Sequence, residues 1–247
     1  MRNWRWRRSC RAIAGARATS WRASWPSSRS ARPNTRGAER VRLIETEADL
    51  AEGAAHLARV EPRFGHALAL TGPLPLRRRP QGFAALLDAL VSQQLSVAAA
   101  DAIWARMQAA GLTAPAPLRD APEMSLAACG LSRQKIGYVR ALAAAELDFE
   151  ALAGLPEEDV VTELTRIRGI GRWTAEIYVM FALGRADAFA AGDLALQESA
   201  RLLLGLSARP REPELRELAS PWAPWRGVAA RLLWAYYRVA KEREGTR

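Results

Sequence analysis

LTRIRGIGRWTA, residues 164–175, is the stretch that decides the fold. Its centre is Gly169-Ile170-Gly171, and segments with helical apolar spacing lie on both sides of it (157–167 and 173–183). Glycines with this spacing also occur in dinucleotide-binding turns, but those turns follow a β-strand and need a third glycine where this chain has Thr174. A G-x-x-x-x-G-K-[ST] phosphate loop occurs nowhere in the sequence. The stretch therefore predicts two helices joined by a short glycine turn.

This glycine turn has two interpretations on spacing alone. Glycine permits a tight turn and the close approach of another backbone. The amides at the start of the second helix point outward, where they and the helix dipole can hold a phosphate, and Arg166, Arg168 and Arg172 add positive charge nearby. An ordinary αα-turn ended by a glycine cap fits the spacing equally well. The residues of the turn leave both interpretations open.

From Val41 onward the chain has the pattern of helices. Thr46 and Asp49 predict one helix start and Ser96 predicts another, whereas Pro62–Pro80 has the composition of a loop. Without any run of alternating β-branched residues, few or no strands are expected, so the predicted fold class is all-α. The predicted helices run over about Thr46–Val60, Phe83–Val91, Ser96–Ala110, Arg133–Glu146, Glu157–Ile167, Trp173–Leu183, Leu194–Leu206, Glu212–Leu218 and Arg226–Lys241.

The net charge of +10 lies entirely in the first part of the chain. Residues 1–40 hold eleven Arg and one acidic residue, whereas residues 41–247 hold 25 basic and 25 acidic residues. Any basic patch on the folded part must therefore be local. The chain lacks eighteen consecutive apolar residues, which excludes a membrane-spanning helix. Its two cysteines, Cys10 and Cys129, are too few for a disulfide scaffold or a four-cysteine cluster, and favour a reducing compartment.

Residues 1–40 form a basic tail of Arg, Ser, Ala and Trp without periodicity. The tail lacks the apolar core of a secretory signal. Three interpretations remain: a disordered arm that holds phosphates, an organellar presequence, or upstream sequence translated from a start codon assigned too early. We favour the last, because the composition changes abruptly at Val41. The expected domain occupies residues 41–247.

The stretch 164–175 closely resembles the hairpin of the helix-hairpin-helix-GPD superfamily of base-excision DNA glycosylases, and within it the bacterial 3-methyladenine DNA glycosylase II group. Residues 90–97 (LVSQQLSV) are similar to the loop that this family places at the DNA minor groove, and residues 222–226 (WAPWR) to the entry of its C-terminal helix. The resemblance covers about Gly82–Tyr237. It implies a two-lobed helical bundle with DNA bound in a cleft between the lobes. Larger members carry a β-rich lobe for which this chain shows no pattern, so the substrate range stays open.

The resemblance also implies a catalytic carboxylate. Family members have an aspartate about two dozen residues after the hairpin, and Asp193 lies 22 residues after Gly171. The family loop often contains proline, whereas this one has only Gly192. The position also suits the N-cap of a following helix, and a cap would fix the aim of the carboxylate. Asp187 is the alternative. A fixed carboxylate stabilises the positive charge that develops on the sugar as the N-glycosidic bond breaks.

Trp173 and Trp234 match positions that line the base pocket in the alkylation-repair group, where an aromatic face favours a cationic base. Core packing explains Trp173 equally well, whereas Trp234 lies off the apolar stripe of its helix. Tyr178 is a further pocket candidate, and Trp222 and Trp225 are expected to be structural.

By the same resemblance, the DNA contacts are expected in two places. One of the adjacent pair Gln93 and Gln94 is expected to fill the gap left by the flipped base, although an exposed polar turn fits them too. Relatives often have leucine where this chain has Gln94. Basic residues at 77–79 and 132–135 have the pattern of solvated loops that can also touch phosphate. The expected contacts at the hairpin are Arg168, Gly169, Gly171, Arg172 and Thr174.

The position that holds a lysine in bifunctional relatives is Trp173 here, and the only lysines are Lys135 and Lys241. A Schiff-base lyase reaction needs such an amine, so a monofunctional hydrolase without cofactor or metal is expected. Its partner would be duplex DNA with damaged bases, its location the cytoplasm at the nucleoid, and its state a monomer. A non-catalytic DNA-binding protein and a glycosylase for uracil or hypoxanthine are the alternatives; Asp193 and Trp234 argue against the first.

Overall fold

The computed structural model describes residues 41–245, without the side chains of residues 97 and 242–245, so the basic tail lies outside the described residues. Within this range the chain is all-helical, as predicted. The elements are α1 (Glu47–Val60), α2 (Pro62–Thr71), α3 (Phe83–Ser92), α4 (Val97–Ala109), α5 (Pro115–Asp120), α6 (Glu123–Ala128), α7 (Arg133–Ala144), α8 (Phe149–Gly154), α9 (Glu157–Thr165), α10 (Arg172–Phe181), α11 (Leu194–Leu204), α12 (Glu212–Leu218), the 3₁₀ turn η1 (Ser220–Trp222) and α13 (Arg226–Gly245).

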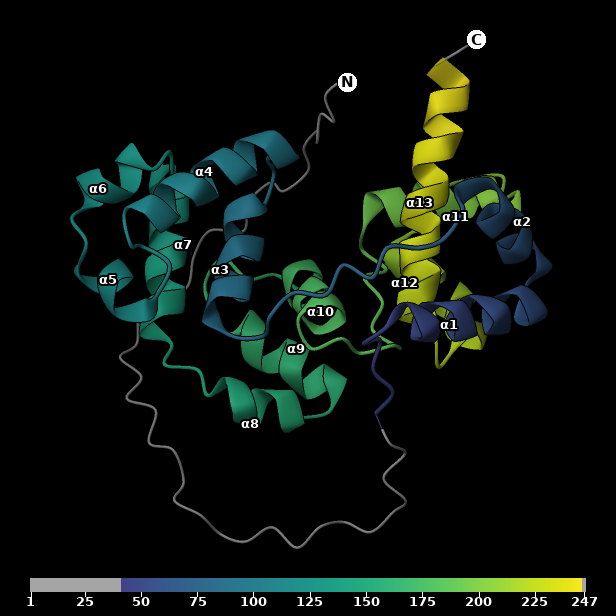
Figure 1. Cartoon of the computed structure of the whole chain (residues 1–247), viewed down its shortest axis with the longest axis horizontal. Helices are drawn as coiled ribbons and strands as arrows, with labels where there is room; N and C mark the ends of the chain where they lie inside the picture. The colour runs from purple at the N-terminus through teal and green to yellow at the C-terminus, as the bar shows by residue number, and fades with distance from the viewer. Residues whose placement is uncertain (1–40, 246–247) are drawn as a thin grey trace, which may run out of the picture.

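The helices form two lobes (Figure 1). The central lobe contains α3–α10, with α3 packed on α4, α7 and α10. The terminal lobe contains α1, α2 and α11–α13, with α13 packed on α1, α2 and α11. The chain passes from one lobe to the other through the linker 72–82 and again through the loop 182–193. Both ends of the described chain therefore belong to one lobe, and the residues between them form the other.

Side-chain caps start several of the helices at the positions the sequence predicted. Thr46 and Asp49 form a reciprocal capping box at α1, with Thr46 N–H donating to Asp49 Oδ2 at 2.8 Å. Ser96 accepts from Ala99 N–H at the start of α4. Each cap satisfies an amide that has no partner inside its own helix. These helix starts are local properties of the sequence.

The loop predicted over Pro62–Pro80 is wrong in its first half, because Pro62–Thr71 is helix α2. Proline occupies the first turn, where its missing N–H is not needed, and the Glu61 side chain accepts from Arg63 N–H. Phe64 and Ala67 lie on one face and are buried against the terminal lobe. The short helices α5, α6 and α8 were also not predicted, because six residues are too few to show a helical period.

Aromatic packing holds the terminal lobe together and confirms the structural role expected for Trp222 and Trp225. Both indoles are buried. Trp222 meets Phe64 edge to face with the ring centroids 5.0 Å apart, and Trp225 lies against Gly53, where any larger side chain would collide with it. Such contacts anchor α13 against α1 and α2.

A short antiparallel bridge joins the beginning of the described chain to the loop 182–193. Ile44 N–H donates to Gly184 O at 2.7 Å, and Ala186 N–H donates to Arg42 O at 2.9 Å. Ala186 O in turn accepts from Gly227 N–H at 2.7 Å, at the start of α13. This second crossing between the lobes is thereby held on both sides, which fixes the entry to α11.

Candidate active site and nucleic-acid interface

Asp193 is the N-cap of α11, at the junction of the two lobes. Its Oδ1 accepts from the backbone N–H groups of Ala195 at 2.8 Å and Leu196 at 3.0 Å. The residue is only 2% exposed. The local sequence explains this cap, since Gly192-Asp193 directly precedes the apolar run that forms the helix. Capping and burial together restrict the carboxylate to one orientation.

Two tryptophans from different lobes converge on this carboxylate. Trp173 Nε1, from the first turn of α10, donates to Asp193 Oδ2 at 2.9 Å. Trp234 Nε1, from α13, donates to Asp193 Oδ1 at 3.2 Å. Both indoles are half-buried, and the Trp234 ring stacks on Phe181 with centroids 5.9 Å apart. The structure therefore unites the three residues that the resemblance selected separately.

The Asp193 carboxylate thus receives four N–H donors, two from the backbone and two from indoles. Hydrogen bonds to an ionised acceptor are stronger than neutral ones, and they hold the acceptor in a defined direction. Because Asp193 is buried beside two aromatic rings, a negative charge here interacts more strongly than in water with a positive charge brought beside it. This arrangement can stabilise a cation that forms next to the carboxylate.

Asp187, the alternative carboxylate, is occupied elsewhere. Its two oxygens accept from Arg226 Nε at 2.8 Å and Arg226 Nη2 at 2.5 Å. This bidentate pair joins the loop 182–193 to the start of α13. Its surroundings are those of a structural ion pair, whereas Asp193 is the carboxylate that faces the indoles.

The glycine turn lies between α9 and α10, so the prediction of two helices joined by a short glycine turn is confirmed. Gly169 has φ +96° and lies against Tyr138 of α7, where an added Cβ would come within 2.3 Å of the ring. Gly171 is exposed, caps α10 without a side-chain hydrogen bond, and has open space on its Cβ side. One glycine thus allows close packing, and the other leaves the first amides of α10 accessible from outside.

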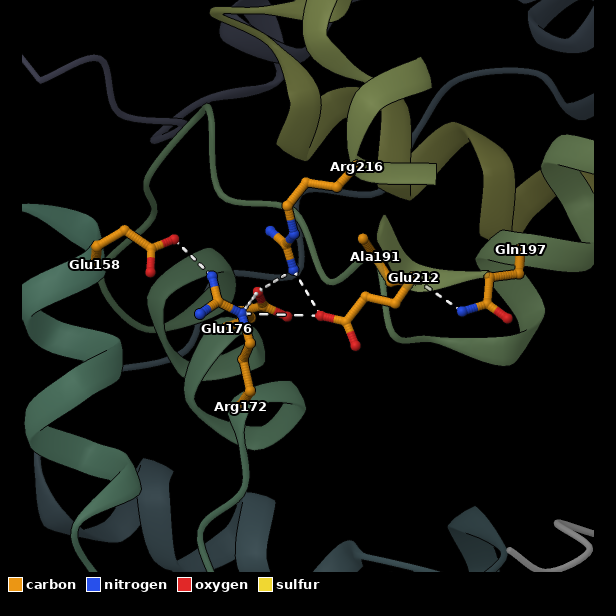
Figure 2. Close-up of polar contacts among 7 residues, drawn as sticks. All are labelled: Glu158, Arg172, Glu176, Ala191, Gln197, Glu212 and Arg216. Atoms are coloured by element: carbon orange, nitrogen blue, oxygen red, sulfur yellow. Dashed lines mark hydrogen bonds and ion pairs between the residues drawn. The ribbon is translucent and has the colours of Figure 1, made fainter. Parts of the chain in front are cut away.

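The arginines around the turn separate into two environments. Arg168 directly precedes Gly169 of the turn and is exposed. Arg172 points instead into a network of ion pairs (Figure 2), where it meets Glu158 at 2.6 Å and Glu176 at 2.9 Å. The Glu158 hydrogen bond raises the pKa of the Arg172 guanidinium. The charge of Arg172 is therefore shared with two carboxylates, and its predicted DNA contact stays a prediction.

The network in Figure 2 continues from α10 to α12 of the terminal lobe. The Glu176 side chain is 3% exposed and accepts from Arg216 Nη2 at 2.9 Å, while Arg216 also meets Glu212 at 3.0 Å. Burial raises the pKa of the Glu176 carboxyl in spite of its two arginine partners. A charged carboxylate is expensive to bury, so this network connects the lobes at an electrostatic cost.

Gln93 and Gln94 have different surroundings. Gln93 Nε2 donates to Gly169 O at 3.0 Å and to Thr174 Oγ1 at 2.8 Å, which ties the end of α3 to the glycine turn and buries Thr174 beneath it. Gln94 is exposed and has the left-handed φ of +59°. Of the two, Gln94 is therefore the side chain free to reach outward.

Lys135 is a residue whose environment the sequence did not indicate. Its Nζ donates to Val91 O and, at 2.8 Å, to Gln93 O, the last carbonyls of α3. Burial lowers the pKa of this amine to about 8. The sequence shows only a basic cluster at residues 132–135, and no local pattern indicates that the C-terminal end of α3 contacts Lys135.

Tyr178 is fully buried within α10. Its hydroxyl accepts from Gly82 N–H at 3.1 Å, and burial raises the pKa of the phenol. The ring tilts against Phe149 with centroids 6.3 Å apart. Through these contacts Tyr178 joins α10 to α8 and to the linker 72–82. The aromatic residues that reach Asp193 are Trp173 and Trp234.

Among residues 41–241, no three His, Cys, Asp or Glu side chains come together as possible metal ligands. No helix in the described part is long and apolar enough to cross a membrane.

A family model matches the part of the chain that carries these features. It is described as HhH-GPD superfamily base excision DNA repair protein and matches residues 87–224, more than half of the chain. This span contains the glycine turn, Gln93 and Gln94, and Asp193. The chain therefore belongs to the HhH-GPD superfamily of base excision DNA repair proteins.

Individual relatives define the region of the superfamily more closely. An alkylbase DNA glycosidase-like protein of Schizosaccharomyces pombe is 28% identical, with 77% of this chain and 95% of the relative covered. The crystal structure of DNA-3-methyladenine glycosidase from Bacillus halodurans is 33% identical with a TM-score of 0.68, covering 77% and 91%. The 3-methyladenine DNA glycosylase of S. pombe, solved with abasic DNA, is 30% identical with a TM-score of 0.67, covering 74% and 95%. The resemblance seen in the sequence is confirmed.

Proposed function

We propose that this protein is a monofunctional DNA glycosylase that hydrolyses the N-glycosidic bond of alkylated purines of the 3-methyladenine type in duplex DNA. The observation that carries the proposal is the buried Asp193 carboxylate, held by two amides and two indoles at the junction of the lobes. The names of its relatives, which include 3-methyladenine glycosylases, support the same substrate class.

In this mechanism the damaged nucleotide leaves the duplex and its base enters a pocket beside Trp173 and Trp234. Extrusion costs a few kcal/mol, least for damaged bases that pair poorly. As the bond to the base breaks, positive charge develops on the sugar, and the aligned Asp193 carboxylate stabilises it. The base leaves with the bonding electron pair, which neutralises the positive charge of the alkylated ring, and water adds to the sugar carbon and releases one proton to the solvent. The indole faces favour a base that carries positive charge.

The glycine turn and Gln94 would hold the DNA in this proposal. The open amides of α10 and the exposed Arg168 suit a backbone phosphate at a helix N-terminus. The exposed Gln94 suits the space vacated by the flipped base, and Gln93 fixes the distance between this loop and the turn. Gly169 supports the same contact from behind, because it lets the turn pack on Tyr138. The DNA would therefore cross the junction of the two lobes.

A hydrolase without lyase activity is the form we propose. Lyase chemistry needs an amine that attacks the sugar carbon, and the residue beside Asp193 is Trp173. The Lys135 amine is directed to the carbonyls of α3, and Lys241 lies near the end of α13 over the Tyr237 ring. The expected product is an intact strand with an abasic site.

We also propose that residues 41–247 are the glycosylase domain and that the protein acts as a monomer without cofactor, in the cytoplasm at the nucleoid. Both lobes and all the residues discussed lie within this range. The full chain and a 41–247 chain are expected to release base at the same rate. A slower truncated enzyme would assign the basic tail a role in holding DNA.

The central test compares base release from alkylated duplex DNA by the wild type and Asp193→Asn. Asparagine keeps the shape and can still cap α11, but it removes the charge. We expect a loss of about 100-fold or more in the single-turnover rate, similar to the loss of other transition-state electrostatic contacts. The strand should stay uncut until alkali is added. Equal release by both proteins would mean that another group stabilises the sugar.

Binding without release would have a different meaning. If both proteins bind duplex DNA but neither releases 3-methyladenine, 7-methylguanine, hypoxanthine or uracil, the chain is a DNA-binding protein without catalysis. Release of uracil or hypoxanthine alone would keep the mechanism and change the substrate.

A further inference from the structure

Four arginines that make no ion pair with a carboxylate of the described residues lie near Trp234: Arg77, Arg78, Arg231 and Arg238. A small hollow is lined by Arg77 from the linker 72–82, by Phe181 at the end of α10, and by Arg231, Trp234 and Arg238 of α13. Residues 231, 234 and 238 lie on one face of α13, because they are three and four positions apart. The indole that donates to Asp193 is therefore also a wall of this hollow.

Arg231 is a buried cation with part of its guanidinium unsatisfied. It is 5% exposed, and its Nε has no hydrogen-bond partner. Its other nitrogens donate to Gly227 O at 2.8 Å and Met180 O at 3.1 Å, and the guanidinium stacks over Phe181 at 4.6 Å. Burial, with the neighbouring charges of Arg78 and Arg77, lowers the pKa of Arg231 to about 10. A charge in this environment needs a counter-ion to be favourable.

Within the described residues, none of the ion pairs involves Arg77, Arg78, Arg231 or Arg238. Carbonyls at the C-terminus of α10 compensate in part, since Arg78 Nη1 donates to Ala182 O at 3.2 Å. A helix C-terminus supplies only about half of a negative charge, against four guanidinium charges. The net charge around this hollow is therefore strongly positive.

The backbone of Arg77 is held in an uncommon conformation. Its φ is +50°, in the left-handed region that a residue with a Cβ rarely adopts. Arg79 N–H donates to Phe181 O at 3.0 Å, and the Arg78 guanidinium lies against Gly184. The linker is thus moulded onto the end of α10 in a way that keeps Arg77 beside Arg238, although the two charges repel. An anion bound between Arg77 and Arg238 would offset both the cost of this backbone conformation and the repulsion between the two guanidinium groups.

We propose that this hollow is an anion-binding site for a phosphate group, with Arg77, Arg231 and Arg238 as its ligands. Guanidinium groups bind phosphate oxygens through paired N–H donors, and three of them line this hollow. In the enzyme bound to DNA, the phosphate is a backbone phosphate next to the extruded nucleotide. That assignment rests on the proposed function, whereas the anion site itself does not.

The test uses the full chain with Arg77→Gln/Arg238→Gln, which spares the buried Arg231 and therefore the fold. The control is Arg59→Gln/Arg209→Gln, which removes the same charge from exposed sites in the terminal lobe. Affinity for a duplex with an abasic-site analogue is measured between about 50 and 200 mM salt. Each lost phosphate contact lowers the slope of log affinity against log salt by about 0.9. In parallel, the Tm of each protein is measured with inorganic phosphate and with chloride at equal ionic strength.

A smaller salt slope in the Arg77/Arg238 variant, with no change in the control, supports a DNA phosphate at this site. An unchanged slope, with phosphate raising the Tm of the wild type but not of that variant, supports a site for free phosphate. If neither the slope nor the phosphate effect differs between variant and control, the anion site is refuted. None of these readouts needs catalysis, so a wild type that binds but releases no base would refute the proposed function separately.

Discussion

At the scale of single residues, the Asp193 carboxylate both caps α11 and accepts hydrogen bonds from two indoles. One oxygen caps α11 and also accepts from Trp234, and the other accepts from Trp173. The helix thereby aims the carboxylate, and the indoles set its distance from any ring that stacks on them. Since the residue is almost fully covered, a substrate sugar would have to displace part of this cover to come beside the charge in the proposed reaction.

Replacing Trp234 by Phe tests the indole hydrogen bond at this scale. Phenylalanine retains an aromatic ring beside Phe181 but has no N–H for Asp193. We expect the single-turnover rate of base release to fall about tenfold, which corresponds to about 1.4 kcal/mol in the barrier. Trp104→Phe, which changes a half-buried indole of α4, should leave the rate unchanged. An unchanged rate in Trp234→Phe would mean that the backbone cap and Trp173 are sufficient to orient the carboxylate.

At the scale of elements, the end of α3 is held by a side chain from another helix. Lys135 of α7 donates to Val91 O and Gln93 O, so it satisfies carbonyls that have no partner within α3. Gln93 then reaches the glycine turn, and Gln94 takes its left-handed conformation. The loop that would enter the DNA therefore depends on an amine in α7, more than forty residues away.

The lowered pKa of Lys135 predicts how stability varies with pH. The amine has a pKa of about 8 in the folded protein and about 10.4 when unfolded, so the unfolded chain binds its proton more tightly. This group therefore makes the free energy of unfolding increase as the pH rises from about 8 to about 10. In urea unfolding at several pH values, the difference between wild type and Lys135→Met should grow over that range. The control is Lys241→Met, and equal behaviour of both variants would contradict the prediction.

At the scale of the whole molecule, the two lobes are joined by charge as well as by chain. The network of Figure 2 connects α9 and α10 of the central lobe to α12 of the terminal lobe through Glu176. Since the site around Asp193 takes one indole from each lobe, its geometry depends on how the lobes are held. This network is therefore expected to matter for catalysis through the positions of the two lobes.

Arg216→Met should test that connection. It leaves the buried Glu176 with Arg172 as its single strong cation, and we expect the free energy of unfolding to fall by about 2 kcal/mol, less than for a fully buried pair because Arg216 is partly exposed. Arg211→Met, in the exposed pair with Glu214 at the start of α12, is the matched control and should unfold like the wild type. Equal urea midpoints for the two variants would show that the ion pairs of Arg216 do not stabilise the folded protein.

Local features could be read from the sequence because their causes span only a few residues. The glycine turn, the all-helical pattern and the caps at Thr46, Ser96 and Asp193 each depend on neighbours within one helical turn. The family resemblance added the roles of particular positions. The helix at Pro62–Thr71 is not predicted because the composition of Pro62–Pro80 as a whole is that of a loop, although proline is favourable in the first turn of a helix.

Convergence was decided only by the tertiary structure. Trp173 and Trp234 are 20 and 41 residues from the carboxylate they share, and Lys135 is 42 residues from Gln93. Pattern and propensity carry no information on such distances, because packing of separate helices sets them. The same reason explains why Arg172 turns into an ion-pair network and why Arg77, Arg231 and Arg238 meet in one hollow. Sequence thus determined which helices form and which residues are suited to the chemistry, and the packing of two lobes decided which of them act together.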